Sequence, residues 1–271
     1  MKYRGILKNK KRIVVKIGTS TISYSNGRLN FQLIEKLAYV LSAIRNKGID
    51  IILVSSGSIG VGAGHLGLTA KPVKLSKKQA LAAIGQAELI KIYQKFFEEY
   101  KQIIAQVLLT KDIVTIPKRQ VNAKNTLIKL LSMGIIPIIN ENDTIATYEI
   151  EFGDNDTLSA HVAALISADL LIMLSDIDGL YSADPKTELS AKIIHTVHQI
   201  TPQLEKHATN SGESFSTGGM KTKIAAVKIC GDANIDTVIT NGADPAIIFD
   251  ILDGKKIGTH FIANENALTN N

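Results

Sequence analysis

Two separated segments of the chain each combine glycine, a hydroxyl group and lysine. One runs from residue 13 to 20 (IVVKIGTS) and the other from residue 216 to 223 (STGGMKTK), and neither has the spacing of a Walker-type P-loop. Glycine lets the backbone approach phosphate oxygens, amide groups bind those oxygens, and lysine offsets their charge. Two such segments predict a phosphate held from both sides. Phosphoryl transfer requires this arrangement, because it depends mostly on positioning and charge stabilisation.

Polar clusters occur at or just after several of the apolar segments that read as strands. These clusters are Gly18, Ser56-Gly57, Asn140 to Asp143, and Ser175-Asp176. In a parallel sheet the carboxyl ends of the strands meet at one edge, and ligands bind there. The clusters therefore predict a site at that edge, built from segments that are distant in the sequence.

The apolar periodicity alternates between strand-like and helix-like along the chain. Short runs rich in Val, Ile and Leu predict strands at residues 13–17, 51–54, 103–109, 135–139, 170–174 and 236–240. A helical apolar period predicts helices at residues 31–45, 77–100, 123–133, 158–166 and 220–230, and residues 148–152 read as a short extended piece. Nearly continuous apolar strands alternating with helices predict a mostly parallel sheet covered on both faces, a three-layer α/β/α sandwich.

The overall composition is that of a globular protein with a mild positive charge. The 31 Lys and Arg residues against 25 Asp and Glu give a net charge of +6, and the single cysteine, Cys230, excludes an intramolecular disulfide. We therefore expect a reducing, cytoplasmic location and a packed, apolar role for Cys230. No apolar run reaches the roughly 18 residues of a membrane span. The sequence has no basic stripe with interleaved aromatic residues, the pattern that would indicate nucleic-acid binding.

We interpret the basic N-terminal stretch, which includes Arg4 and Lys10, as a solvated extension.

Three tempting motifs have simpler interpretations. Residues 62–67 match the G-x-G-x-x-G of dinucleotide-binding proteins, but they begin eight residues after Val54 instead of in the tight turn after a strand. Gly60, Gly62 and Gly64 instead predict a helix or loop packed against neighbouring backbone. His195 and His198 lack a nearby Cys or acidic partner to complete a zinc site. Ser58 lacks the glycine two positions before it that a hydrolase nucleophile elbow requires, because Ser56 stands there.

Several sequence blocks together resemble the amino acid kinase family. The blocks are residues 14–20 (VVKIGTS), 55–59 (SSGSI), 139–143 (INEND), 152–160 (FGDNDTLSA), 179–185 (GLYSADP) and 218–223 (GGMKTK). The last four resemble the glutamate 5-kinase branch of that family in order and spacing. Many members of that branch continue into a C-terminal PUA domain, whereas this sequence ends at Asn271. The resemblance implies one amino acid kinase domain over residues 1–271, with an acceptor-binding lobe of about 1–165, a nucleotide-binding lobe of about 166–271 and no PUA domain.

The resemblance implies transfer of a phosphoryl group from ATP to the side-chain carboxylate of L-glutamate, which gives L-glutamyl 5-phosphate and ADP at the first step of proline biosynthesis. Lys16 and Lys223 would then neutralise the transferring group from two sides, and Asp156 would pair with both lysines. The residues implied in nucleotide binding are Lys16, Ser175, Asp176, Thr217, Gly218, Gly219, Met220, Lys221, Thr222 and Lys223. Mg²⁺ would be held mainly through the nucleotide phosphates, so no protein ligand is assigned to it.

Glutamate carries an ammonium and two carboxylates, so a buried pocket for it must answer both signs of charge. The family pattern assigns the ammonium to Asp143 and Asn155, and a carboxylate to Ser56 and the backbone amide of Gly57, with Asn140 as a further contact. The family also implies feedback inhibition by proline. Because the product is a reactive acyl phosphate, we expect transfer to a glutamyl-phosphate reductase, and we expect a homo-oligomer.

Other interpretations of the same residues remain open at this point. Lys16 could cap a strand at the surface, and residues 154–156 could form a polar cap ahead of a helix. Within the family, the acceptor could be aspartate, acetylglutamate, carbamate or UMP. A non-catalytic ligand sensor on the same fold is the alternative from a different class, although a sensor would not need both Lys16 and Lys223.

Overall fold

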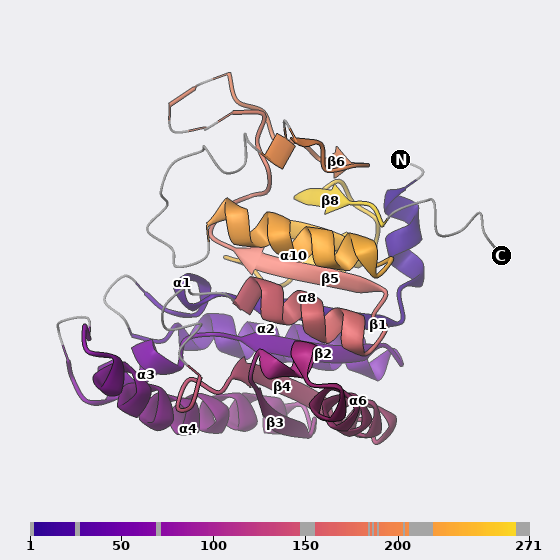
Figure 1. The fold of residues 1–271 in the computed structure, drawn as a ribbon. Helices are drawn as coiled ribbons and strands as arrows, with labels where there is room; N and C mark the ends of the chain where they lie inside the picture. The colour runs from indigo at the N-terminus through magenta and orange to yellow at the C-terminus, as the bar shows by residue number, and fades with distance from the viewer. Residues whose placement is uncertain are drawn as a thin grey trace.

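A single eight-stranded sheet organises the part of the chain that the structure describes (Figure 1). The computed structural model describes residues 3–24, 28–68, 72–146, 155–183, 185, 187–188, 190–202, 204–205 and 219–263. The strands are β1 Arg12–Ile17, β2 Asp50–Ser55, β3 Ile104–Leu109, β4 Ile136–Glu141, β5 Leu170–Ser175, β6 Thr196–Val197, β7 Asp236–Asn241 and β8 Thr259–Phe261. Their order is β3-β4-β2-β1-β5-β7-β8-β6, and every neighbouring pair is parallel except β7 and β8. The predicted mostly parallel sheet is confirmed.

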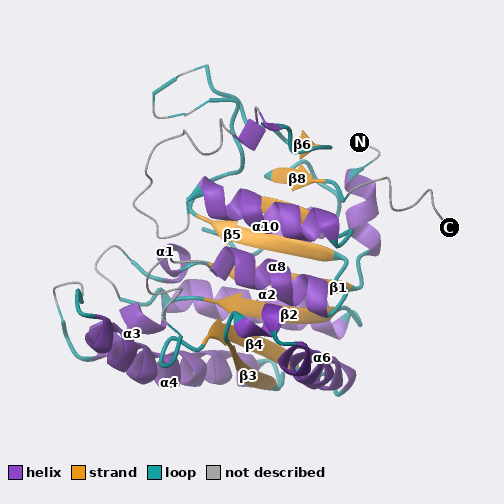
Figure 2. Cartoon of the chain, in the orientation of Figure 1, coloured by secondary structure: helices purple, strands orange, loops and turns teal. Residues whose placement is uncertain are grey.

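Helices lie on both faces of this sheet (Figure 2). They are the 3-10 helix η1 Arg4–Asn9 and the α-helices α1 Thr19–Ile22, α2 Phe31–Asn46, α3 Ser58–His65, α4 Leu75–Glu99, α5 Asp112–Thr115, α6 Pro117–Ser132, α8 Asn155–Leu165, α10 Met220–Asp232 and α11 Ile247–Leu252. Helix α2 packs on one face, and α8 and α10 cover the other. The predicted three-layer sandwich is therefore confirmed. No described helix combines the length and apolar character needed to traverse a lipid bilayer.

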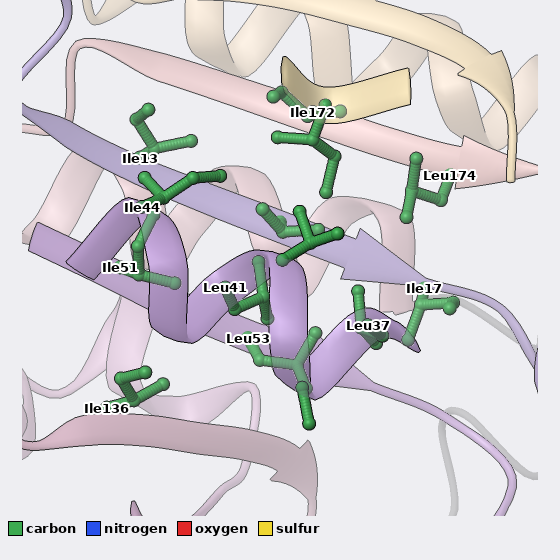
Figure 3. Packing of buried hydrophobic residues seen from close by; sticks show 14 of the residues in the cluster. Ile13, Ile17, Leu37, Leu41, Ile44, Ile51, Leu53, Ile136, Ile172 and Leu174 are labelled. Carbon is green, nitrogen blue, oxygen red and sulfur yellow. The ribbon is translucent and has the colours of Figure 1, made fainter. Parts of the chain in front are cut away.

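The alternation of side chains along the strands builds a separate apolar layer on each face. On one face, apolar side chains of β1, β2 and β5 meet Leu37, Leu41 and Ile44 of α2 (Figure 3). On the other face, Val14 and its neighbours from β2 and β5 pack against α8 and α10. Because successive strand residues point to opposite faces, Lys16 shares the face of Val14. The strand register thus directs this lysine toward the layer of α8 and α10.

The N-terminal stretch is not the solvated extension that its charge suggested. It forms η1, in which Arg4 is 5% exposed. The Arg4 guanidinium donates hydrogen bonds of 2.6 Å to the backbone carbonyls of His195 and Ile257, and burial lowers its pKa to about 10. The ammonium of Lys10 lies 2.6 Å from a carboxylate oxygen of Asp236 at the start of β7. These basic side chains attach the N-terminus to the β6–β8 end of the sheet.

Most predicted elements lie close to the observed ones, and the differences have local causes. Helix α6 begins at Pro117 instead of residue 123, because proline is favoured in the first turn of a helix, where its missing amide hydrogen is not needed. Strands β6 and β8 contain two and three residues, too few to produce a recognisable alternation, and the sequence did not indicate them. The extended piece predicted at residues 148–152 lies outside the described residues.

Two glycines allow α3 and α4 to meet backbone to backbone. A Cβ atom on Gly62 of α3 would collide with the carbonyl group of Leu81, and one on Gly85 of α4 would collide with that of Ser58. This confirms close backbone packing for Gly62, within the segment that matched G-x-G-x-x-G. The contact also fixes Ser58, the first residue of α3, against the middle of α4.

We expect Gly62→Ala to destabilise the protein by about 2 kcal/mol or more, because the added methyl group overpacks a backbone contact that cannot yield. Gly60→Ala is the matched control in the same helix. Its Cβ would meet only a side-chain methyl of Thr19, at 3.7 Å, so the higher helix propensity of alanine should make it neutral or stabilising by up to about 1 kcal/mol. Urea unfolding of the two variants tests this, and equal stabilities would contradict the packing argument.

Candidate active site

A buried carboxylate between two buried ammonium groups lies at the centre of the candidate site. Lys16 is the penultimate residue of β1, Asp156 lies in the first turn of α8, and Lys223 lies in the first turn of α10. The Lys16 Nζ atom is 2.7 Å from Asp156 Oδ1, and the Lys223 Nζ atom is 3.3 Å from Asp156 Oδ2. The side chains are 9%, 5% and 1% exposed for Lys16, Lys223 and Asp156. The structure thus brings together three residues that the sequence separates by more than two hundred positions.

The electrostatics of this cluster keep the Asp156 carboxylate ionised. Burial alone would raise the pKa of Asp156, but the charges of Lys16 and Lys223, with hydrogen bonds from Lys16 and Thr222, lower it to about 2. The Thr222 hydroxyl lies 2.8 Å from Asp156 Oδ2. Burial lowers the pKa of Lys223, and although Asp156 raises it, the nearby Lys16 adds a further decrease. An anion that arrived beside the lysines would relieve the repulsion between them.

The predicted acceptor residues form a second cluster next to the first. The side-chain amide of Asn155 donates to the hydroxyl of Ser56 at 2.6 Å and to the Oδ1 atom of Asn140 at 2.9 Å. All three side chains are buried. Asn155 and Asp156 are consecutive residues of α8, so the start of this helix supplies one side chain to each cluster.

Two side-chain oxygen atoms of the predicted acceptor residues have no hydrogen-bond partner within the described part of the chain. They are the Oδ1 atoms of Asp143 and Asn155, and both are buried. The other oxygen of Asp143 accepts a hydrogen bond of 2.8 Å from Ser58. Burial raises the pKa of Asp143, and the Ser58 hydrogen bond partly opposes that rise. Buried acceptors normally have donors, so these two oxygens can receive the hydrogen atoms of a ligand such as an ammonium group.

Gly57 connects β2 to α3 in a conformation that suits glycine. Its φ of 111° lies in the left-handed region, and a Cβ atom there would approach the side chain of Ile22 to 2.9 Å. Gly57 is also the N-cap of α3. The amides of the first helical turn have no acceptor within the helix, so this turn can bind a carboxylate.

The predicted nucleotide residues lie at the ends of β5 and α10. Ser175 ends β5, and its hydroxyl donates a 3.0 Å hydrogen bond to the exposed Asp176. Gly219 is the N-cap of α10, and Met220, Lys221 and Thr222 follow it in the first turn. Lys221 is exposed, whereas Lys223 is buried against Asp156, so Lys223 is the lysine of this turn that joins the charged cluster. Thr217 and Gly218 lie outside the described residues.

Two side chains that support the predicted acceptor residues were not predicted from the sequence. Ser58 binds Asp143, and Gln86 of α4 accepts a 2.9 Å hydrogen bond from the Asn140 side-chain amide. Ser58 lies in the quoted SSGSI block, so its position was noticed but its contact was not. Gln86 lies inside a long predicted helix, where nothing in the local sequence indicates a role.

Comparison with known proteins decides the family. The model of the amino acid kinase family matches residues 11–241. The chain belongs to the amino acid kinase family. It is 52% identical over 266 residues to glutamate 5-kinase of Listeria monocytogenes serovar 1/2a, covering 97% of this chain and 96% of the relative. It is 50% identical over 266 residues to glutamate 5-kinase of Clostridium perfringens strain 13, covering 97% and 99%.

A solved structure has a similar fold. The UMP kinase of Bacillus anthracis superposes with a TM-score of 0.61 and covers 94% of this chain and 96% of its own, although only 15% of the residues are identical. The two chains therefore share the fold where little sequence identity remains.

We expect the Asp156 carboxylate to contribute stability that is present above the ordinary pKa of 3.8 and is lost as the pH falls toward 2, because its folded-state pKa is about 2. Asp156→Asn cannot lose this contribution, so the difference in unfolding free energy between the two proteins should depend on pH. Between neutral pH and about pH 2.5, the unfolding free energy of the unmodified protein should fall by about 1.5 kcal/mol relative to that of Asp156→Asn. Denaturant unfolding at several pH values measures it, and a constant difference would contradict the double ion pair.

Proposed function

We propose that this chain transfers the terminal phosphoryl group of ATP to the side-chain carboxylate of L-glutamate, giving L-glutamyl 5-phosphate and ADP at the first step of proline biosynthesis. The observation that carries the proposal is the contact of Lys16 and Lys223 with one buried carboxylate, that of Asp156. The cluster of predicted acceptor residues around Asn155 begins at the next residue of the same helix. Relatives about half identical over nearly the whole chain bear the name glutamate 5-kinase, which supports this substrate.

The proposed chemistry needs charge stabilisation more than proton transfer. The acceptor carboxylate is already a nucleophile, so the main barrier is the repulsion between two anions brought into line. Lys16 and Lys223 would stabilise the transferring group from two sides, and Asp156 would hold the two ammonium groups at a fixed separation. Preorganised charges of this kind cost no rearrangement at the moment of reaction.

The acceptor would bind through groups of both polarities. The unpartnered oxygens of Asp143 and Asn155 would accept from its ammonium. Ser56 and the Gly57 amide would donate to a carboxylate, and Asn140 would hold Asn155 in place. A free amine is central to this arrangement, since an acylated nitrogen offers fewer hydrogen atoms and no charge.

The nucleotide would lie against Ser175, Asp176 and the segment 217–223. The start of α10 offers amide hydrogens and the positive end of a helix dipole to its phosphates, next to Lys223. Mg²⁺ commonly binds through substrate phosphates and water, so the nucleotide phosphates would hold most of it. The ion would offset phosphate charge.

Three features of the wider biology belong to the same proposal. Residues up to about 165 would form the acceptor-binding lobe and the remainder the nucleotide-binding lobe. Proline, as the end product, would inhibit the enzyme. The acyl phosphate hydrolyses readily in water, so a glutamyl-phosphate reductase would receive it, and the chain would act as a homo-oligomer.

The direct test is ADP release from ATP with a panel of acceptors. L-glutamate should support turnover, and L-aspartate, N-acetyl-L-glutamate, carbamate and UMP should support far less. ADP release with UMP and none with glutamate would overturn the proposed substrate. No release with any acceptor would favour a ligand sensor.

We expect Lys16→Ala and Lys223→Ala each to reduce turnover by about 10²–10³-fold, because each removes a preorganised charge from the transition state. Lys228→Ala is the control on α10. The ammonium of this exposed lysine lies 2.6 Å from a carboxylate oxygen of Glu205 and does not belong to the cluster. ADP release at saturating ATP and glutamate measures the effect, with circular dichroism to verify folding. Near-normal turnover in either cluster variant would contradict the assigned roles.

We expect the KM for glutamate to rise as the pH falls through the raised pKa of Asp143, because the neutral carboxyl no longer pairs with the substrate ammonium. Ser58→Ala removes the hydrogen bond that lowers this pKa, so the rise should begin at a higher pH. The exposed Ser132→Ala on α6 is the control. Initial rates across the acid range test this, and superimposable profiles for Ser58→Ala and the unmodified protein would refute it.

A further inference from the structure

Helix α4 contacts the segments that carry the predicted acceptor residues at three points, although no motif lies on it. Gly85 meets the backbone of Ser58. Gln86, the next residue, accepts a hydrogen bond from Asn140. Two turns further along, the buried hydroxyl of Tyr93 lies 2.8 Å from that of Ser55 at the end of β2. The helix is therefore attached to both β2 and β4 where these strands meet the candidate site.

The contact of Gln86 completes a chain of hydrogen bonds whose direction is set by a backbone group. The backbone amide of Glu141 can only donate, and it donates to Asn140 Oδ1 at 2.9 Å. The Asn140 carbonyl oxygen must therefore face Glu141, which turns its amide nitrogen toward Gln86. The Gln86 side-chain oxygen is the acceptor that keeps this nitrogen satisfied inside the protein.

The donor and acceptor order of these hydrogen bonds continues through Asn155 to Ser56, toward the proposed ligand. Asn140 Oδ1 also accepts from Asn155 Nδ2, whose second hydrogen goes to the Ser56 oxygen. Both amide hydrogens of Asn155 are then used, and its Oδ1 atom is left as an acceptor. The Ser56 oxygen accepts from Asn155, so its own hydrogen remains available to donate. If the side-chain amide of Asn140 were flipped, that of Asn155 would have to flip as well. Asn155 would then present its NH₂ group, a donor, where the proposed ammonium needs an acceptor.

We propose that Gln86 is a positioning residue that holds Asn140, and through it Asn155 and Ser56, in the orientation that accepts a free amine and donates to a carboxylate. This inference rests on the proposed function, because it deepens the account of how that site selects a free amino acid. Gln86 acts through its neighbours and touches no reacting atom. Its oxygen, and not its amide nitrogen, is the atom that matters.

The test compares Gln86→Leu, which removes the acceptor, with Gln86→Glu, which keeps an oxygen at the same place. Gln86→Leu should raise the KM for L-glutamate about tenfold or more while the KM for ATP stays within about twofold, since one hydrogen bond in a buried network is lost. Gln86→Glu should keep the KM for glutamate within about threefold of the unmodified protein. Gln94→Leu is the matched control, because Gln94 is an exposed residue of the same helix.

The outcomes separate this inference from the proposed function. If the unmodified protein releases ADP with glutamate but Gln86→Leu leaves the KM for glutamate unchanged, the positioning role is wrong and the proposed function stands. Equal changes in both KM values with a lowered Tm, or failure of Gln86→Glu to retain the glutamate KM, would reduce Gln86 to a packing residue. If the unmodified protein does not use glutamate at all, both ideas fail.

Discussion

The arrangement of this protein depends on burying two ammonium groups against one carboxylate. Removing such charges from water costs several kcal/mol per ion, and attraction to a partner repays the cost only when the geometry is good. Asp156 offers one negative charge to two positive ones, and the more distant Asp176 adds to it. Under the proposed function, a phosphoryl group would supply the further negative charge that two ammonium groups can accept.

Three layers of structure must cooperate to bring these charges together. The alternation of β1 turns Lys16 toward α8 and α10, and both helices begin at the carboxyl edge of the sheet. The sheet order places β1 between β2, which leads to the proposed acceptor residues, and β5, which leads to the proposed nucleotide residues. Under the proposed function, Lys16 would therefore lie at the boundary between the two substrates. The likeness to UMP kinase at 15% identity indicates that the fold, at least, tolerates extensive sequence change.

The sequence was sufficient for the features that depend on short-range patterns. Strand and helix periods predicted the layers, and compact glycine-lysine motifs led to Lys16 and Lys223. Contacts that depend on packing between distant elements left no such pattern. Gln86 reaches Asn140 only because two glycines let α3 and α4 approach, and Arg4 is buried only because distant backbone carbonyls surround it. Charge alone misled the interpretation of Arg4, since a basic residue is usually solvated.

The adjacency of Asn155 and Asp156 has a consequence for how the two substrates stay aligned. Neighbouring residues of an α-helix differ by a rise of about 1.5 Å and about a quarter turn, so their side chains diverge from a common origin at a fixed angle. Under the proposed function, the first turn of α8 would therefore set the distance between the amine subsite and the carboxylate that pairs with both lysines. A tilt or slide of this turn would move Asn155 and Asp156 together, so their relative placement would be kept.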